Sequence, residues 1–349
     1  MKALTFNGIQ HVRYESAPDP TLLADTDAVV KVKSCAICGS DLHVYFGRET
    51  GCDHHTAMGH EFAGEVVEVG SGVKLLRMGD SVMSPFTTSC GQCYFCRRGL
   101  TCRCVHGQLF GWVEQGQGLQ GGQAEYVRVS LADSTLMKIP EGVDVEEALL
   151  LGDIASTGFY CALQAEIQPT DVQAVVGCGP VGLMTIIGAR ELGAENLFAI
   201  DTVPERLAMA ARLGARAINP QQTDVWEVIH QATQGRGADA VMEAVGSGGA
   251  AALSYRLLRP GGILSTVGVC TDSHFAFSPT QAYDKNLTLK TGRCPARAMM
   301  PRLVPLVQQK KYDFLSVITH RLSLREGVRG YDIFANKKEN CLKVVLAVD

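Results

Sequence analysis

The chain has 349 residues, 46% of them hydrophobic, and a formal net charge of −4. A chain of this length exceeds what one hydrophobic core usually serves, so we expect two domains. The small negative net charge gives no reason to expect a surface that binds nucleic acid or anionic membranes. No stretch reaches the roughly 18 consecutive apolar residues that a membrane span needs. The first residues lack the apolar run of a signal peptide, and thirteen cysteines without such a signal favour a reducing compartment. We therefore expect a cytoplasmic protein with neither a nucleic-acid nor a membrane partner.

The first part of the chain, to about residue 145, alternates short β-rich runs with Gly, Pro and Asp. Strands are expected at 29–33, 63–69 and 124–129. These runs predict a barrel-like β domain that carries long functional loops.

From about Asp171 the pattern changes to strands that alternate with helices. Expected strands are 172–176, 197–200, 239–245 and 262–267. Expected helices are 181–192, one from near Pro204 to Gly214, 224–233 and 250–258. This alternation predicts βαβ units and a parallel sheet. After about Lys290 the pattern is mixed, and we expect the final apolar run, 342–348, to return to the first domain.

Five cysteines gather in one short segment. Cys90, Cys93 and Cys96 stand three residues apart, and Cys104 follows after a seven-residue gap. Such spacing suits a tetrahedral zinc cage with bonds of about 2.3 Å. Disulfides are the alternative, but neighbours three apart rarely have bridge geometry and five cysteines cannot all pair. We expect a structural zinc, with Cys102 as the spare cysteine.

A glycine-rich turn follows the first strand of the alternating region. It is a GxGxxG motif made of Gly177, Gly179, Pro180, Val181 and Gly182. The glycines allow a tight turn and close approach of a pyrophosphate, which the helix N-terminus attracts. Asp201 ends the next strand nineteen residues beyond Gly182, where a ribose-binding acid belongs. Together these residues predict a dinucleotide site.

Asp201 also indicates which dinucleotide binds. A carboxylate accepts hydrogen bonds from ribose hydroxyls but repels a 2′-phosphate, by about 4 kcal/mol at about 4 Å and a dielectric of about 20. We therefore expect NAD(H) to be preferred over NADP(H). Arg206 could receive a 2′-phosphate, or it could be an ordinary solvated residue of the following helix.

A second group of metal-binding residue types lies upstream of the cysteine cluster. Cys38, Ser40 and His43 place a thiol, a hydroxyl and an imidazole within six residues, and His60 and Glu61 follow. Any one of them alone would more often be a packing or surface residue. Their combination favours a second site.

These motifs together resemble the zinc-dependent medium-chain dehydrogenase/reductase family, the alcohol dehydrogenases. The family's GHExxGxxxxxG pattern stands at 59–70, and the cysteine cluster and GxGxxG motif follow in family order. The similarity covers essentially the whole chain. It implies an α/β fold with a GroES-like β-barrel catalytic domain and a Rossmann cofactor domain. We expect the catalytic domain at 1–155 with both zinc sites, the NAD-binding domain at 156–290, and a return to the catalytic domain at 291–349.

The resemblance implies a catalytic zinc held by Cys38, His60 and Asp153, the last replacing a cysteine found in many members. From its sequence context alone, Asp153 would be a helix N-cap. Glu61 is expected to lie behind the ligands or to bind only transiently, because a third anion would make the site net negative. Cys104 keeps the family's gap and is expected to be the fourth structural ligand, which makes two zinc ions per chain.

The implied reaction is reversible oxidation of a primary or secondary alcohol to an aldehyde or ketone, with hydride passing to NAD. Ser40 would take the proton and pass it through the cofactor ribose to His43, unless His43 is a loop histidine bonded to backbone. Further cofactor contacts are implied for Val267, Gly268, Val269, Arg293 and Lys343, although Lys343 could simply be solvated on an edge strand. The substrate wall would include Phe46, Phe86 and Trp112, each of which could equally belong to a core.

Other functions compete with this one. Within oxidoreductases they are a polyol dehydrogenase of sorbitol or threonine type and an aldehyde reductase. A non-enzymatic zinc-ribbon binding protein is disfavoured because no basic stripe with interleaved aromatics occurs. A catalytically inactive family member is disfavoured because Cys38, His60 and Asp153 are all present. The family and the length favour a homotetramer over a dimer.

Overall fold

The computed structural model describes residues 1–348 of the chain, in two compact units. The first unit comprises Met1–Ser156 and the segment from Pro295 onward, and the second comprises Thr157–Cys294. The first unit is therefore made from both ends of the chain. The second is made from one continuous segment.

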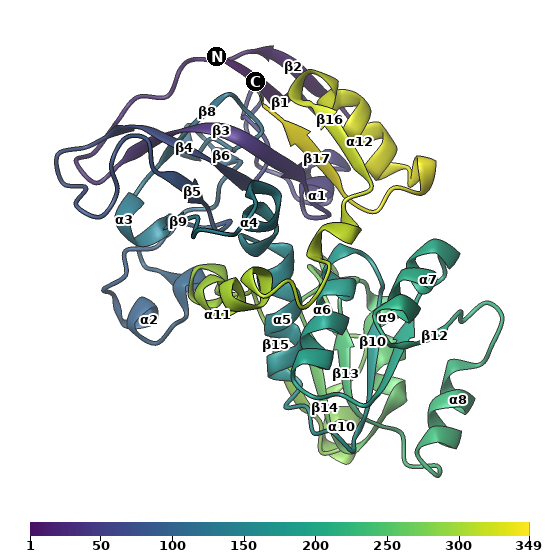
Figure 1. Cartoon of the computed structure of the whole chain (residues 1–349). Helices are drawn as coiled ribbons and strands as arrows, with labels where there is room; N and C mark the ends of the chain where they lie inside the picture. The colour runs from purple at the N-terminus through teal and green to yellow at the C-terminus, as the bar shows by residue number, and fades with distance from the viewer. Residues whose placement is uncertain (349) are drawn as a thin grey trace. The chain divides into compact units, whose positions relative to one another are not determined.

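The first unit is built on a seven-stranded sheet ordered β16-β17-β3-β4-β5-β9, with β8 also paired to β3. Its strands are β3 (Ala28–Ile37), β4 (Glu61–Val69), β5 (Ser81–Met83), β8 (Tyr126–Val129), β9 (Met137–Lys138), β16 (His320–Ser323) and β17 (Val344–Ala347). β17, the last strand of the chain, pairs with β3 on one side and β16 on the other, so it is an interior strand (Figure 1).

Smaller elements surround this sheet. They include the hairpins β1 (Lys2–Phe6) with β2 (Val12–Ser16) and β6 (Trp112–Glu114) with β7 (Gln117–Leu119). The helices are α1 (Asp41–Tyr45), α2 (Tyr94–Arg97), α3 (Ala132–Thr135), α4 (Val145–Leu151), α11 (Ala296–Gln308) and α12 (Gly327–Ala335), with 3₁₀ turns η1 (Thr101–Arg103), η2 (Phe314–Val317), η3 (Leu324–Glu326) and η4 (Lys338–Asn340). The core of the unit combines residues of both chain ends, such as Leu4, Phe62 and Tyr331.

The second unit contains a six-stranded sheet in which every neighbouring pair is parallel, ordered β12-β11-β10-β13-β14-β15. Its strands are β10 (Val172–Val176), β11 (Asn196–Ile200), β12 (Arg216–Ile218), β13 (Ala238–Glu243), β14 (Leu258–Thr266) and β15 (Thr288–Thr291). This is the Rossmann order 3-2-1-4-5-6. All residues of β10 and β13 are buried, as expected for strands covered on both faces.

Several helices of this unit begin at residues that are favourable at a helix N-terminus. They are α5 (Ile154–Gln164), which starts in the first unit, α6 (Pro180–Glu191), α7 (Pro204–Arg212), α8 (Val225–Ala232), α9 (Gly248–Leu257) and α10 (Pro279–Asp284). α6, α7 and α10 begin with proline, whose missing N–H costs nothing there. Asp224 caps α8 by accepting the N–H of Trp226.

The predicted α/β class with a parallel sheet is confirmed, but several predicted boundaries differ from the structure by two or more residues; for example, the strand predicted at 29–33 is β3, which extends to Ile37. The strand predicted from residue 262 begins at Leu258, so Pro260 and the two glycines after it lie inside β14. The pairing of β14 with β13 shifts register near Ala238, and this irregularity accommodates Pro260 and the two glycines within the strand. Helix α9 begins at Gly248, two residues earlier than predicted, because Ser247 accepts the N–H of Ala250.

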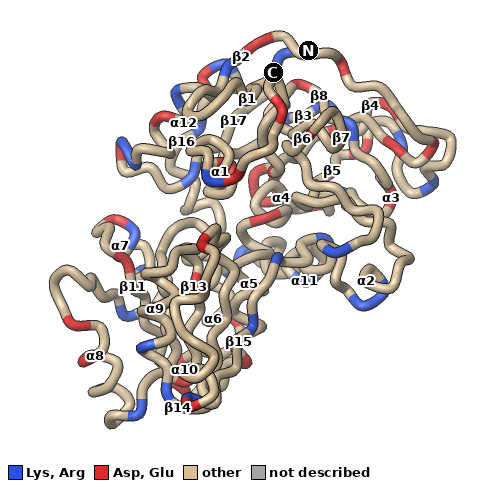
Figure 2. The backbone as a smooth tube through the Cα atoms, turned by 180° about the vertical axis from the view of Figure 1, so that it is seen from behind, with Lys and Arg blue, Asp and Glu red and all other residues tan. Residues whose placement is uncertain are grey.

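Charged residues of both signs occur along the whole described chain. Acidic and basic residues are mixed in both units (Figure 2). Within residues 1–348, no helix combines the length and the apolar character needed to cross a bilayer.

Candidate active site and metal centres

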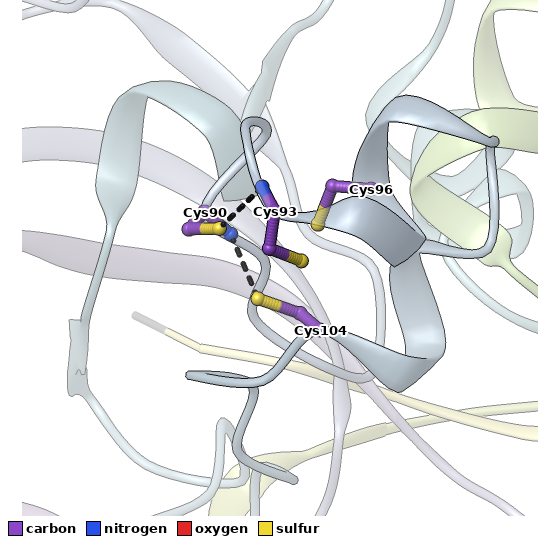
Figure 3. A group of neighbouring side chains, drawn as sticks. All are labelled: Cys90, Cys93, Cys96 and Cys104. Carbon is purple, nitrogen blue, oxygen red and sulfur yellow. Dashed lines mark hydrogen bonds between the residues drawn. The ribbon is translucent and has the colours of Figure 1, made fainter.

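The cysteine-rich segment of the first unit gathers four sulfur atoms around one point. The sulfurs of Cys90, Cys93, Cys96 and Cys104 all lie within 4.8 Å of one another and face inward (Figure 3). A tetrahedral zinc ion with bonds of about 2.3 Å separates its sulfur ligands by about 3.8 Å, so the group fits such an ion. Cys102 lies one turn away on η1 and is not a member of this group.

Backbone N–H groups already point at these sulfurs. Cys104 accepts the N–H of Cys90 at 3.2 Å and of His106 at 3.4 Å, and Cys90 accepts the N–H of Cys93 at 3.4 Å. Backbone N–H groups of Cys96 and Val105 lower the pKa of Cys93 to about 6, whereas burial raises the pKa of Cys96 to about 12 and also raises that of Cys104. Four thiolates around Zn²⁺ would leave a net charge of about −2, and these donors are placed to stabilise it.

The second group of ligand types is brought together by the pairing of β3 with β4. These strands run antiparallel with Ala36 opposite Glu61, so Cys38, just after β3, and His60, just before β4, lie at the same end of the sheet. Asp153, between α4 and α5, completes the group. Its Oδ2 lies 3.5 Å from the sulfur of Cys38 and 3.3 Å from Nε2 of His60.

These distances fit a metal ion. A tetrahedral ion with bonds of about 2.1 Å separates its ligand atoms by about 3.4 Å, and a thiolate, an imidazole and a carboxylate form a set that zinc accepts. Burial raises the pKa of Cys38, and the nearby Asp153 raises it further. Burial would lower the pKa of His60, but Asp41 and Asp153 raise it well above its usual value. The surroundings thus favour positive charge at this point, which a divalent cation would supply.

Asp41 is a site residue that the sequence reasoning missed. Its Oδ1 lies 3.1 Å from Nδ1 of His60, and its Oδ2 accepts the backbone N–H of Cys38 at 2.9 Å. A carboxylate behind a ligating histidine fixes the ring and leaves Nε2 free for the metal. The sequence did contain one indication of this role, because Asp41 is an acidic residue three positions after the candidate ligand Cys38.

Glu61 lies in the same cluster but is held by another residue. Its Oε2 accepts a hydrogen bond from the ammonium of Lys343, and both side chains are buried. Among the described residues Oε1 has no hydrogen-bond partner. Burial raises the pKa of Glu61 to about 7, although Lys343 opposes the rise. Glu61 therefore lies within reach of the metal position while an internal cation compensates its charge.

The interpretation of Lys343 as a solvated edge-strand residue is wrong. It immediately precedes β17, an interior strand, and its side chain is fully buried against Glu61. Its contact with a cofactor pyrophosphate stays a prediction.

Ser40 lies beside two of the proposed ligands, and His43 follows on helix α1; their part in a proton relay stays a prediction. The Ser40 hydroxyl donates to the sulfur of Cys38 at 3.3 Å and lies 3.2 Å from Nε2 of His60. His43 lies in helix α1 rather than in a loop. No described residue forms a hydrogen bond with its buried Nδ1. The alternative that His43 is a loop histidine bonded to backbone is therefore wrong for Nδ1. Burial lowers the pKa of His43, so its imidazole is neutral near pH 7.

The three aromatic candidates for the substrate wall have different surroundings. Phe86 is buried and meets His60 edge-on, with ring centroids 6.3 Å apart. Phe46 follows α1 and packs edge-on against Tyr45. Trp112 packs against the core of the first unit, and its indole N–H donates to Glu114 at 3.4 Å. Phe86 is therefore the candidate that contacts a proposed ligand directly.

The dinucleotide motif has the expected geometry in the second unit. Gly177 has φ +93°, and a Cβ on Gly182 would overlap the carbonyl oxygen of Gly177. Asp201 binds the turn itself, because its Oδ2 accepts the N–H of Cys178 at 2.7 Å. Arg206 is not fully solvated: its guanidinium lies 4.0 Å from Asp201.

Other predicted cofactor residues lie at the ends of later strands. Val267 donates its N–H to the carbonyl oxygen of Glu243 at 3.1 Å, and a Cβ on Gly268 would overlap Gly246. Val269 and Arg293 are exposed. Their contacts with a dinucleotide stay predictions.

Comparisons with known proteins agree with this geometry. Residues 24–141 match the alcohol dehydrogenase GroES-like domain, and residues 180–309 match the zinc-binding dehydrogenase domain. A zinc-type alcohol dehydrogenase B of Aspergillus flavus is 41% identical over 99% of this chain and 80% of its own length. An NADP-dependent isopropanol dehydrogenase of Thermoanaerobacter brockii is 32% identical over 92% of each chain. The solved structure of an alcohol dehydrogenase from Thermus sp. ATN1 superimposes with a TM-score of 0.93, at 38% identity over 100% of both chains.

A Rossmann unit, a GroES-like unit and two clusters of zinc-ligand types define an oxidoreductase that uses zinc and a nicotinamide cofactor. The chain belongs to the zinc-dependent medium-chain dehydrogenase/reductase family, with the zinc-type alcohol dehydrogenases.

Proposed function

We propose that this protein is an NAD-linked alcohol dehydrogenase that reversibly oxidises primary or secondary alcohols to aldehydes or ketones. The observation that carries the proposal is the convergence of Cys38, His60 and Asp153 on one buried point, with the hydroxyl of Ser40 beside it. A carboxylate and a thiolate balance the charge of Zn²⁺, as two thiolates do in other members of the family.

Bound zinc would supply a Lewis acid that acidifies the substrate hydroxyl and polarises the product carbonyl. Ser40 takes up the proton that leaves the substrate, because its hydroxyl is the neutral donor and acceptor next to the ligands. His43, which is neutral near pH 7, accepts the proton afterwards. The buried ring of Phe86 meets His60 edge-on and adds an apolar surface beside the proposed ligands, which supports an apolar substrate.

NAD(H) is proposed as the preferred cofactor because Asp201 places a carboxylate at the end of β11, next to the glycine turn. Repulsion of a 2′-phosphate by this carboxylate is about 4 kcal/mol at about 4 Å, and Arg206 offsets part of it. The ratio of kcat/KM for NAD⁺ and NADP⁺ tests this choice. A ratio that favours NADP⁺ would contradict it.

One assay tests the activity itself. Purified protein is given NAD⁺ with a panel of primary, secondary and polyhydric alcohols, and NADH absorbance is followed while zinc is measured in parallel. We expect turnover of simple alcohols and two zinc ions per chain. Turnover of polyols alone would identify a polyol dehydrogenase instead, and turnover only of aldehydes with NADH would identify a reductase. We further propose that the protein is cytoplasmic and a homotetramer. Sedimentation of the intact protein tests the tetramer, and cell fractionation tests the location.

A further inference from the structure

We infer that Gln123 and Tyr331 are positioning residues for the proposed catalytic metal centre. Tyr331 donates to Gln123, Gln123 donates to Asp41, and Asp41 holds His60. The inference rests on the proposed function, because it takes His60 to be a zinc ligand. Neither residue touches the ligand atoms, so both act through Asp41.

The direction of these hydrogen bonds follows from chemistry. One end of the Gln123 amide faces the carbonyl oxygen of Ala36 at 3.0 Å and Oδ2 of Asp41 at 3.2 Å. Both of those atoms only accept, so the amide nitrogen must face them. The amide oxygen then faces Tyr331, whose hydroxyl donates to it at 2.8 Å. Burial and the charge of Asp41 raise the pKa of Tyr331 well above its usual value, so the hydroxyl keeps its proton.

The backbone is built to place the Gln123 side chain there. Its N–H donates to Met58 at 2.9 Å, and its carbonyl oxygen accepts from Leu4 at 2.8 Å. Gly59, directly before His60, has φ +85°, and a Cβ on it would overlap the Gln123 side chain. Because Gly59 has no Cβ, it leaves the space through which the Gln123 side chain reaches Asp41.

The two oxygens of the Asp41 carboxylate have different hydrogen-bond partners, and this difference orients His60. Oδ2 receives two donors, the backbone N–H of Cys38 and the Gln123 amide, which leaves Oδ1 for Nδ1 of His60 at 3.1 Å. A fixed carboxylate keeps the proton of His60 on Nδ1, so the lone pair of Nε2 would be free to bind a metal held by the proposed ligands. Asp41, Gln123 and Tyr331 are all buried, where such bonds are strong and an unpaired polar atom is costly.

Tyr331 connects this network to the C-terminal segment. It lies on α12, and its ring stacks on Tyr45 of α1 with centroids 5.5 Å apart. Asp41 begins the same helix α1. The last part of the chain therefore supports the carboxylate behind His60 through both a hydrogen bond and a ring contact.

The test compares Tyr331→Phe, Gln123→Met and the double variant with wild type, each as the full-length protein. Zinc affinity is measured by competition with a chelator, and Co²⁺ substituted at the catalytic site is examined by visible absorption. The cysteine cage provides an internal reference in every sample. Tyr45→Phe is the matched control, because it removes a neighbouring phenol hydroxyl that is outside the hydrogen-bonded chain.

We expect the catalytic zinc to bind about tenfold more weakly in Gln123→Met and about threefold more weakly in Tyr331→Phe, with shifted Co²⁺ bands and an unchanged cage. The double variant should resemble Gln123→Met, because Tyr331 acts through Gln123. Unchanged affinity and Co²⁺ spectrum in folded Tyr331→Phe and Gln123→Met would overturn this inference alone. A wild-type protein with no zinc outside the cage would overturn the proposed function together with it.

Discussion

At the scale of single residues, the Ser40 hydroxyl is the group that we propose to receive the proton of the substrate. It lies within hydrogen-bonding distance of Cys38 and His60, yet it is not itself a group that zinc prefers. Its contribution can therefore be removed without removing the proposed ligands.

Replacing Ser40 with alanine should lower kcat by about 10² to 10⁴-fold, the usual contribution of one positioned acid–base group. Zinc content should stay at two ions per chain, since no proposed ligand changes. Steady-state kinetics with metal analysis measure both quantities. Ser40→Thr is the matched control, because it keeps a hydroxyl and should retain most activity. Unaltered kcat in Ser40→Ala would refute the proton route.

Glu15 shows how one carboxylate links a hairpin to the segment that leads to His60. It lies on β2 and accepts from Thr5 of β1 at 2.6 Å, while His55 approaches it at 2.8 Å. The bonds from Thr5 and His55 lower the pKa of Glu15 to about 2. Because the folded pKa lies below the ordinary 4.5, this stabilisation is present above about pH 4.5 and is lost as pH falls toward about 2.

Glu15→Gln should therefore lower the free energy of unfolding by about 1 kcal/mol at neutral pH, a size typical of partly exposed pairs. The difference from wild type should shrink as pH falls from 4.5 to 2. Chemical unfolding at a series of pH values measures it. Glu68→Gln, on an exposed position of β4, is the control. A destabilisation that does not vary with pH would mean that the charge of Glu15 contributes nothing.

At the scale of elements, the cysteine lobe consists of short turns with little apolar burial of its own. α2 has four residues and η1 has three, and helices this short are not stable without tertiary contacts. We expect a bound zinc ion to stabilise these turns, because the free energy of metal binding at a structural zinc site contributes directly to the free energy of folding.

The lobe offers a matched pair of substitutions, Cys104→Ser and Cys102→Ser. Cys104→Ser should reduce zinc to about one ion per chain and lower the unfolding temperature by roughly 5 to 10 °C. Cys102→Ser should keep both ions and cost about 1 kcal/mol, because it is buried but outside the cage. Metal analysis and calorimetry distinguish the two. The opposite pattern would assign Cys102 as the fourth ligand.

Whether a feature could be predicted from the sequence depended on how far apart its residues lie along the chain. The cysteine cage and the glycine turn depend on residues close in sequence, so spacing alone indicated them. Asp41, Gln123 and Tyr331 come from three distant segments, and their proximity follows from tertiary packing that no local pattern reveals. Lys343 was misjudged for the same reason, because strand order decides whether a strand is an edge and local sequence does not.

At the scale of the whole molecule, the two units differ in how the chain forms them. The second unit is one continuous segment with its own apolar core and complete sheet. The first depends on its C-terminal part, because β17 pairs with β3, Tyr331 fills the core and Lys343 neutralises Glu61. A break in the chain should therefore affect the two units unequally.

A fragment of residues 157–294 should fold alone, unfold cooperatively and bind NADH. Residues 1–156 alone should not fold, because the β17 edge of β3 would be unpaired and Glu61 would be a buried carboxylate without its cation. Adding residues 295–349 through a flexible linker should restore folding and the binding of two zinc ions. Circular dichroism, NADH fluorescence and zinc analysis test each fragment. A cooperative unfolding transition in residues 1–156 alone would show that the C-terminal segment is dispensable for the first unit.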